Sequence, residues 1–370
     1  MIYLDHGATS FVKPDCVKEA MVRALECCAN PGRGGYVAAM NGAKTVYACR
    51  ERAADFFDCD PEQVVFTGSC TQGLNTAIFS LVKPGARVVV SGFEHNAVMR
   101  PLQALGAKIT VAGKKLFDRQ DTLDAFQKAL LAGTDVAVFT HVSNVFGYIL
   151  PVEEMARACR EAKVPFIIDA AQSAGFLPVK LTELGADFIA VPGHKGLLGP
   201  QGTGILLCGA IPKPLVYGGT GSLSASMDMP DFLPDRAEAG TVNVPGIAGL
   251  DAGIRYVQRL GLDRIACRVK REVQRCAKGL GALGYSVFTG PDQLGTVSFL
   301  PREDCERAAE YFEKKGIALR AGLHCAPLAH ESAGTFQTGT LRVSYGHDAS
   351  ACQTAQLLEV AGNRRNTDFL

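Results

Sequence analysis

Residues 166–200 read FIIDAAQSAGFLPVKLTELGADFIAVPGHKGLLGP, and the fold is best deduced from this stretch. Its apolar run Phe166–Ile168 lacks polar alternation, which is typical of a buried strand in a parallel sheet. Asp169 follows that strand directly, and Lys195 follows the next expected strand, Asp187–Val191. One strand–helix–strand unit separates the two groups. We therefore expect both side chains in one crevice beyond the carboxyl ends of the strands.

The types of these two residues favour a particular chemistry. The Asp169 carboxylate lies next to a buried strand and needs a partner, which a protonated ring nitrogen can provide. The structural alternative is that Asp169 caps the following helix. A desolvated lysine with a lowered pKa is suited to Schiff-base formation, whereas a surface loop lysine is the alternative for Lys195. The glycines around Lys195 do not form a P-loop, because no Ser or Thr follows the lysine.

The middle of the chain alternates short β-rich runs with helical stretches, which predicts an α/β fold with a mostly parallel sheet covered on both faces. The expected helices include Gly73–Leu81, Leu123–Ala132 and Val152–Ala162. Besides the two strands above, we expect strands at Val64–Thr67, Arg87–Ser91, Lys108–Val111, Val136–Thr140 and Gly204–Cys208.

The pattern changes after about Val244 and predicts a smaller α+β domain. A long helical region, Pro245–Leu283, precedes short strands, a helix at Arg302–Lys315, a strand at Thr340–Tyr345 and a last helix. Residues 1–13 are expected to pack against this unit. The predicted division is a large domain of residues 14–250 and a small domain of residues 1–13 plus 251–370.

Two further strand ends carry chemically useful groups. The turn Gly68–Asn75 places small and hydroxyl residues before a helix, where backbone N–H groups can bind phosphate, although such turns are also ordinary helix caps. His95 follows the strand Arg87–Ser91 and has a ring that can stack on a planar cofactor, although a lone histidine is more often structural.

Composition excludes several other classes of function. The 370 residues carry a formal net charge of +1, which gives no attraction to nucleic acid or to an anionic membrane. We see no signal peptide and no membrane-spanning run, so a cytoplasmic protein with reduced thiols is expected. The thirteen cysteines lack the paired spacing of zinc sites, and we expect no metal.

Taken in order, these motifs resemble the fold-type I pyridoxal-phosphate enzymes, in the class V aminotransferase branch. Within that branch they are most similar to group II cysteine desulfurases and desulfurase-like proteins. The resemblance covers nearly the whole chain and includes Tyr3–Thr9, Asn30–Gly34 with Arg33, the phosphate turn, Glu94-His95, Asn144, Asp169–Gln172, Gly193–Lys195, Ala239–Thr241, Arg320–Pro327 and Leu341-Arg342.

The resemblance implies a role for each of these residues. Lys195 would carry pyridoxal 5'-phosphate as a Schiff base, Asp169 would pair with the pyridine nitrogen, and His95 would stack on the ring. Gln172 would bind the ring hydroxyl, and the phosphate would be held by Cys70, Thr71 and His194. Thr241 would reach the phosphate of a neighbouring subunit, which implies a homodimer.

The resemblance also implies a substrate site. Asn144 and Arg342 match positions that bind the carboxylate of an amino acid, and Arg320 matches a further active-site arginine. Cys325 matches the nucleophile, whose thiolate attacks the substrate sulfur and leaves as a persulfide. The chain departs from the family at Pro192, where a serine is usual, and at Leu323, where many members have a histidine.

These inferences predict a homodimeric cysteine desulfurase that converts L-cysteine to L-alanine and passes sulfur from Cys325 to an acceptor, expected to be a protein. Three alternatives stay open. One is a selenocysteine lyase, which need not depend on Cys325. Another is an aminotransferase or another C–S lyase, and the third is a cofactor-free scaffold or sulfur-relay protein.

Overall fold

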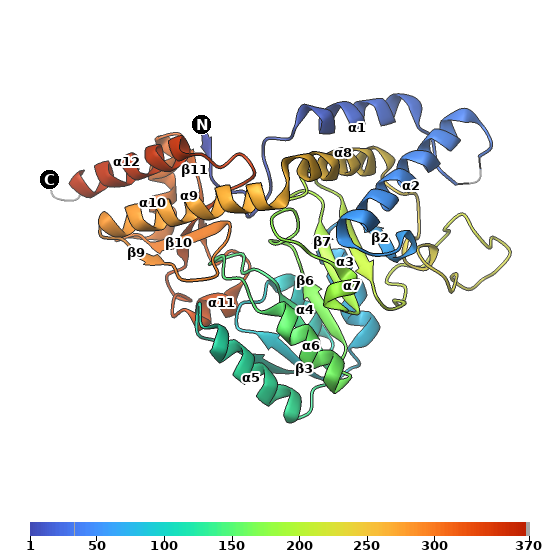
Figure 1. Ribbon diagram of the computed structural model, residues 1–370, viewed down its shortest axis with the longest axis horizontal. Coiled ribbons are helices and arrows are strands. Elements are labelled where there is room, and N and C mark those ends of the chain that lie inside the picture. Colours follow the sequence, from blue (N-terminus) through green and yellow to red (C-terminus); the bar gives the residue numbers. More distant parts are fainter. Residues whose placement is uncertain (33, 368–370) are drawn as a thin grey trace.

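Within residues 1–32 and 34–367, which the computed structural model describes, seven strands form one central sheet (Figure 1). The strands are β2 (Val64–Thr67), β3 (Arg87–Ser91), β4 (Lys108–Ala112), β5 (Val136–Thr140), β6 (Phe166–Asp169), β7 (Phe188–Pro192) and β8 (Gly204–Cys208). Their order is β2-β8-β7-β6-β5-β3-β4. Neighbours from β4 to β7 are parallel, whereas β8 runs antiparallel to β7 and β2. The mostly parallel α/β fold is confirmed, with one antiparallel strand that we did not predict.

Successive residues of the central strands face two different apolar clusters. Val138 of β5 belongs to the cluster formed with α3 (Cys70–Leu81) and α4 (Asn96–Ala104). Its neighbour Phe139 belongs to the cluster on the opposite face. Both faces are therefore buried, which explains the apolar strands without alternation. The opposite face is covered by α2 (Val37–Phe57), α5 (Arg119–Leu131), α6 (Val152–Ala162), α7 (Leu181–Leu184) and α8 (Val244–Leu260).

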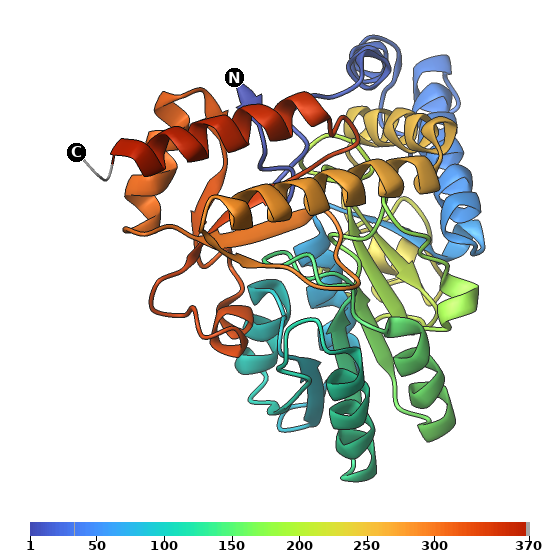
Figure 2. The same ribbon diagram turned by 60° about the vertical axis from the view of Figure 1, so that its left-hand side comes forward.

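A second, antiparallel sheet of the described residues has the order β12-β13-β10-β9. Two helices, α9 and α12, run side by side over it (Figure 2). At the start of the chain, β1 (Ile2–Tyr3) pairs in parallel with β11 (Ile317–Ala318), so these two residues pack against this unit, whereas Ser10 and Lys13 contact His194 of the predicted large domain. The remaining bounds are β9 (Ser286–Phe288), β10 (Thr296–Leu300), β12 (Arg320–Gly322), β13 (Thr340–Ser344), α9 (Leu262–Ala282), α10 (Cys305–Lys314), α11 (Pro327–Ser332) and α12 (Ala351–Thr367).

The helical region expected over Pro245–Leu283 consists of two helices, α8 and α9. They meet at Gly261, whose φ of 80° lies in the region that favours glycine and ends the first helix. Helix α8 packs against α1 (Asp15–Cys27) and α2, and it passes through residue 250. The domain division at that residue stays a prediction. Among the described residues, no helix is long and apolar enough to span a membrane.

Candidate active site

The predicted cofactor and substrate residues meet in one cavity of about 230 Å³ beyond the carboxyl ends of β5, β6 and β7. Thr241 and Cys325 are the predicted site residues that do not line it. The lining consists of Gly7, Ala8, Ser69, Cys70, Thr71, Leu74, His95, Ala97, Thr140, Asn144, Asp169, Ala171, Gln172, Pro192, His194, Lys195, Arg320, His324 and Arg342.

Lys195 and Asp169 both line this cavity. Burial lowers the pKa of the Lys195 amine, and Asp169 opposes that shift. Within the described residues, the amine has no hydrogen-bond or ion-pair partner. Burial also raises the pKa of Asp169. Its Oδ1 accepts the Ala171 N–H at 2.9 Å and the Cys70 thiol at 3.7 Å, and Oδ2 has no such partner in the described chain.

The turn before α3 has unused backbone donors. Ser69 caps the helix, because its Oγ accepts the N–H of Gln72 at 3.1 Å. In the part of the chain that the structure describes, the N–H groups of Cys70 and Thr71 have no hydrogen-bond partner. Both residues line the cavity. Free N–H groups at a helix N-terminus favour a phosphate, which is the role that we expect of this turn from the sequence.

His95 is the N-cap residue of α4, and its Nδ1 accepts the N–H of Ala97 at 3.0 Å. Burial lowers the pKa of His95 to about 4, and the charges of Lys195 and Arg320 add to the effect. The ring is therefore neutral near pH 7, with its proton on Nε2. A neutral, fixed ring suits stacking on a flat cofactor, the role that the resemblance implies.

Glu94 directly precedes His95 in the sequence and is fully buried. Its Oε1 accepts the Thr140 N–H at 2.8 Å and the hydroxyl of Ser91, so it joins the ends of β3 and β5. Burial raises the pKa of Glu94 to about 8. We assigned Glu94 no role from the sequence, although the residue belongs to the motif Glu94-His95 that carries part of the resemblance. Its contacts fix the loop that carries His95.

A hydrogen-bonded clamp holds the turn that carries Lys195. The carbonyl oxygen of His194 accepts the Ser10 N–H at 3.0 Å, the Ser10 hydroxyl at 2.9 Å and the Lys13 amine at 2.9 Å. The His194 ring contacts the Thr9 hydroxyl at 2.9 Å. Burial lowers the pKa of Lys13 to about 8. The sequence motif at residues 3–9 pointed to this segment, but nothing in it predicted contacts 181 to 185 residues away.

We expect Lys13→Ala to loosen the turn around Lys195. A hydrogen bond from a charged donor is worth about 1.5–3 kcal/mol, so cofactor binding should weaken about tenfold or more. In the apoprotein, amides 193–198 should exchange hydrogen faster. Lys18→Ala is the matched control, because the one ion pair of Lys18 in the described part of the chain is with the exposed Asp15. Unchanged exchange and cofactor affinity in Lys13→Ala would contradict the clamp.

The two predicted carboxylate-binding residues contact each other. Arg342 is 1% exposed, and its Nη1 donates to the Asn144 carbonyl at 3.0 Å. Its Nη2 donates to Asp5, a pairing that we did not foresee. Asn144 Nδ2 donates to the His324 carbonyl at 2.7 Å. Asp5 thus orients the guanidinium in advance, and Arg342 Nε is buried without a hydrogen-bond partner among the described residues.

Cys325 lies outside the cavity, on its rim. Its thiol is 3.8 Å from Arg320 Nη2, and its carbonyl accepts the Asn96 N–H at the start of α4 at 2.8 Å. Both His324 and Cys325 have positive φ angles, 50° and 59°, which strain residues with side chains. Two contacts therefore hold an exposed thiol at the mouth of the site in a strained backbone conformation.

Three other predicted residues have different surroundings. Gln172 lines the cavity and donates from Nε2 to the Gly7 carbonyl at 3.0 Å. Thr241 is exposed and lines a separate hollow, so it does not contact its own chain's site. Pro192 is the last residue of β7. The last residues that β6 and β7 pair are Asp169 and Ala190, so Pro192 lies beyond the pairing and its missing N–H interrupts no hydrogen bond to β6. Arg33 of the resemblance lies outside the described residues.

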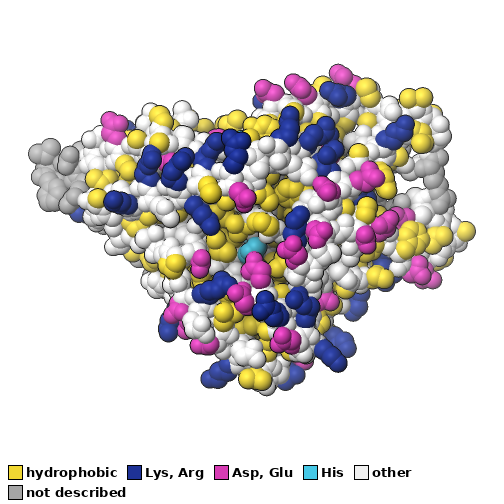
Figure 3. Space-filling view, viewed as in Figure 1, with side chains coloured by type: hydrophobic (Ala, Val, Ile, Leu, Met, Phe, Trp, Pro, Cys, Tyr) yellow, Lys and Arg dark blue, Asp and Glu magenta, His cyan; other side chains and the backbone are white. Residues whose placement is uncertain are grey.

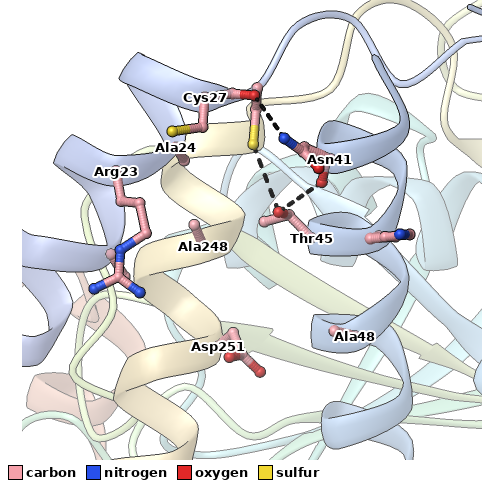
Figure 4. Close-up of a pocket in the computed structure, with 11 residues that line it drawn as sticks. Arg23, Ala24, Cys27, Asn41, Thr45, Ala48, Ala248 and Asp251 are labelled. Atoms are coloured by element: carbon pink, nitrogen blue, oxygen red, sulfur yellow. Dashed lines mark hydrogen bonds between the residues drawn. The ribbon is translucent and has the colours of Figure 1, made fainter. Parts of the chain in front are cut away.

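A wider hollow of about 420 Å³ lies between α1, α2 and α8, away from these groups (Figure 4). Hydrogen bonds join two pairs of its lining residues. Asn41 Nδ2 donates to the Cys27 carbonyl at 3.2 Å, and the Thr45 hydroxyl donates to the Asn41 carbonyl at 2.8 Å. The hollow contains none of the predicted site residues, and we assign no chemistry to it.

The residues of the smaller cavity fit pyridoxal phosphate. Within residues 1–32 and 34–367, the Lys195 amine and Asp169 Oδ2 have no hydrogen-bond partner, and both residues line the cavity, as a cofactor with an aldehyde and a ring nitrogen requires. The free N–H groups of Cys70 and Thr71 lie at the same cavity and suit the phosphate. Among the described residues, no cluster of three or more metal-binding side chains is present.

Buried histidines give a testable dependence of stability on pH. Burial lowers the pKa of His95, His141, His194 and His330 to about 4 and that of His324 to about 2. Below pH 6.5 the unfolded chain binds protons that the folded chain does not, so folding stability falls as the pH drops. Glu94 and Asp169, whose pKa values are raised, act in the opposite sense but are fewer.

We therefore expect the free energy of unfolding of the apoprotein to fall between pH 6.5 and pH 4.5, measured by urea denaturation. Glu94→Gln should make the fall steeper, because it removes an opposing proton uptake. A stability that stays level or rises over this interval would show that the histidines titrate in the folded chain.

Comparison with known proteins agrees with this geometry. The family model for aminotransferase class-V matches residues 2–357. A probable cysteine desulfurase of Methanothermobacter thermautotrophicus is 32% identical, over 98% of this chain and 95% of its own length. A cysteine desulfurase of Escherichia coli is 30% identical, over 88% of this chain and 84% of its own. The apo structure of a cysteine desulfurase from Thermococcus onnurineus superposes with a TM-score of 0.90 at 31% identity, and covers 99% of this chain and 95% of that one.

The match spans the central sheet, the cavity and the unit that carries Arg320, Cys325 and Arg342. The lysine and the carboxylate lie on one cavity, as the sequence predicted. On these observations, the chain belongs to the class-V aminotransferase family of pyridoxal-phosphate-dependent enzymes.

Proposed function

We propose that this protein is a cysteine desulfurase that converts L-cysteine to L-alanine and keeps the sulfur on Cys325. One observation supports this most: an exposed thiol, held beside Arg320, stands at the mouth of the cavity that contains Lys195 and Asp169. Relatives that are named cysteine desulfurases and match most of the chain also support it.

The substrate carboxylate binds to Arg342 and Asn144. Because Asp5 and the Asn144 carbonyl hold two of the guanidinium nitrogens, the arginine is oriented before the amino acid arrives. This places Cα next to Lys195 and the side-chain sulfur toward the cavity mouth. Fixed geometry of this kind removes most of the entropic barrier to reaction.

Bound pyridoxal phosphate withdraws electrons from Cα of the amino acid. Lys195, an amine whose pKa burial lowers, takes the proton from Cα and later returns protons to the carbon skeleton. The Cys325 thiolate attacks the substrate sulfur, the C–S bond breaks, and the sulfur stays on Cys325 as a persulfide. The products are L-alanine and a modified enzyme, with no outside oxidant or reductant.

The active protein is a homodimer, supported by an apolar surface. The loop of residues 210–240 projects from the end of the molecule next to the start of α2 (Figure 1). Hydrophobic side chains gather at that end (Figure 3). A partner that covers them would bring Thr241 near the other subunit's site. The exposed apolar residues of this loop and at the start of α2 include Tyr36, Val37, Val216, Tyr217, Leu223 and Met227.

The persulfide sulfur then passes to an acceptor protein, and the enzyme works in the cytoplasm. All thirteen cysteines lie in the described part of the chain, and none of them forms a disulfide there. Free thiols on this scale suit a reducing compartment.

The products of the reaction test this proposal. The protein, loaded with pyridoxal phosphate, is incubated with L-cysteine and a reductant, and alanine, sulfide and keto acids are measured together. We expect alanine and sulfide in equal amounts. Keto acid in place of alanine would indicate an aminotransferase or another lyase, and a protein that shows no yellow colour with the cofactor would indicate a scaffold.

A further inference from the structure

A second hollow lies on the outer side of Cys325. It measures about 370 Å³ and runs between α3 and α4. Thr71, His95 and Ala97 line both this hollow and the cofactor cavity, so the two are neighbours. Cys325 lines only the outer one. The outer lining consists of Thr71, Asn75, Phe79, His95, Asn96, Ala97, Arg100, Pro101, Ala104 and Cys325.

The proposed reaction requires a second approach to Cys325. The cofactor still occupies the inner cavity after alanine has left, so a later acceptor reaches the persulfide best from the outer hollow, which Cys325 lines. The acceptor's thiolate attacks the outer sulfur, the bond from that sulfur to Cys325 Sγ breaks, and Cys325 leaves as a thiolate. One S–S bond forms as one breaks, so electrons balance.

The charge of the outer hollow selects the acceptor. Arg100 is exposed there and has no hydrogen-bond or ion-pair partner among the described residues. Arg320 Nη2 lies 3.8 Å from the Cys325 thiol. Among the described residues, the lining contains Arg100 and no Asp or Glu, so no carboxylate of the lining offsets the positive charge. Such a site attracts anions and increases their rate of encounter.

We propose that the outer hollow is the binding site of the sulfur acceptor, and that the acceptor is a thiol with carboxylates beside it, attracted by Arg100. This inference rests on the proposed desulfurase function. A volume of about 370 Å³ suits a small molecule or the tip of a peptide loop. A free acidic thiol and an acidic, cysteine-containing segment of a protein would both supply a thiol with carboxylates beside it.

A single-turnover experiment tests the proposal. The holoenzyme is loaded with one equivalent of L-cysteine, freed of small molecules, and mixed with mercaptosuccinate, neutral mercaptoethanol or cationic cysteamine at equal thiolate concentrations. Rates are divided by the amount of persulfide loaded. We expect mercaptosuccinate to react fastest and cysteamine slowest. Arg100→Gln should slow mercaptosuccinate about fivefold and mercaptoethanol less than twofold, and high salt should have the same effect.

Arg100→Glu should reverse the order of the three thiols, and Arg23→Gln, a change of an exposed cation at the distant hollow of Figure 4, should leave it unaltered. A peptide with one cysteine between two glutamates distinguishes the source, because a faster rate than mercaptosuccinate assigns the acceptor to a protein segment. If alanine forms during loading but the three thiols show no charge order, the inference is overturned. If no alanine forms, the proposed function itself fails.

Discussion

Lys195→Ala is expected to lower the turnover of L-cysteine by about 10⁴-fold or more. In the proposed reaction the lysine both holds the cofactor and moves protons at Cα, and general acid–base catalysis alone contributes about 10²–10⁴-fold. The cavity should also lose the yellow colour that the cofactor gains on a lysine. Alanine formation, measured at saturating pyridoxal phosphate, checks the first effect, and the visible absorption spectrum checks the second.

The variant should remain folded. The Lys195 amine has no partner among the described residues, and burial disfavours its charge, so removing it leaves no hydrogen bond unmade. Urea denaturation of Lys195→Ala should therefore give a stability equal to that of the wild type or higher. Lys128→Ala, on the outside of α5, is the matched control and should keep full activity. More than about a tenth of wild-type activity in Lys195→Ala would contradict the assignment.

Cys325→Ala is expected to lower alanine formation from L-cysteine by about 10³-fold or more, with the cofactor still bound. Cys325 contacts Arg320 at the cavity mouth and does not line the cofactor cavity, so the spectrum of the holoenzyme should not change. Activity is measured with L-cysteine and with L-selenocysteine in the same preparations. Loss with cysteine and retention with selenocysteine would show that the thiol accepts sulfur and is dispensable for selenium.

Two other exposed cysteines provide matched controls. Cys267→Ala and Cys352→Ala change thiols of similar exposure outside the site, and neither should affect the alanine rate. Equal sulfide release from the wild type and Cys325→Ala would remove Cys325 as the essential nucleophile. A persulfide found by mass spectrometry on a different cysteine after one turnover would do the same.

The sequence predicted the chemistry at the ends of the parallel strands best. Asp169 ends a strand whose neighbours run in the same direction, so its position relative to the turn of Lys195 follows from topology. The resemblance supplied Asn144 and Arg342, and the structure brings both to the same cavity. These positions were predictable because the strands can be recognised from local sequence pattern, and because ligands in such folds bind beyond the carboxyl ends of the parallel strands.

Contacts between distant segments were not predictable in the same way. The pairing of Asp5 with Arg342 and the clamp of Lys13 on the His194 carbonyl join the first residues to others far along the chain. No local periodicity encodes them. The antiparallel direction of β8 also escaped prediction, because a buried apolar run reads the same in both directions.

The position of Cys325 shows a similar limit. The sequence placed it next to His324 and near Arg320, but could not show that it faces the outer hollow instead of the cofactor cavity. That orientation follows from the left-handed backbone of two successive residues and from the contact with Asn96. The break between α8 and α9 at Gly261 was likewise not predictable, because a single glycine within a helical pattern does not show whether the helix ends there.

The central claim is that one lysine carries the cofactor opposite Asp169. Reducing the pyridoxal-phosphate-loaded protein with borohydride fixes the cofactor to the lysine that holds it, and peptide mapping by mass spectrometry then identifies the residue. We predict the modification on the peptide containing Lys195, at one per chain, and its loss in Lys195→Ala. A modification on Lys13 or on any other lysine, or none at all, would contradict the account.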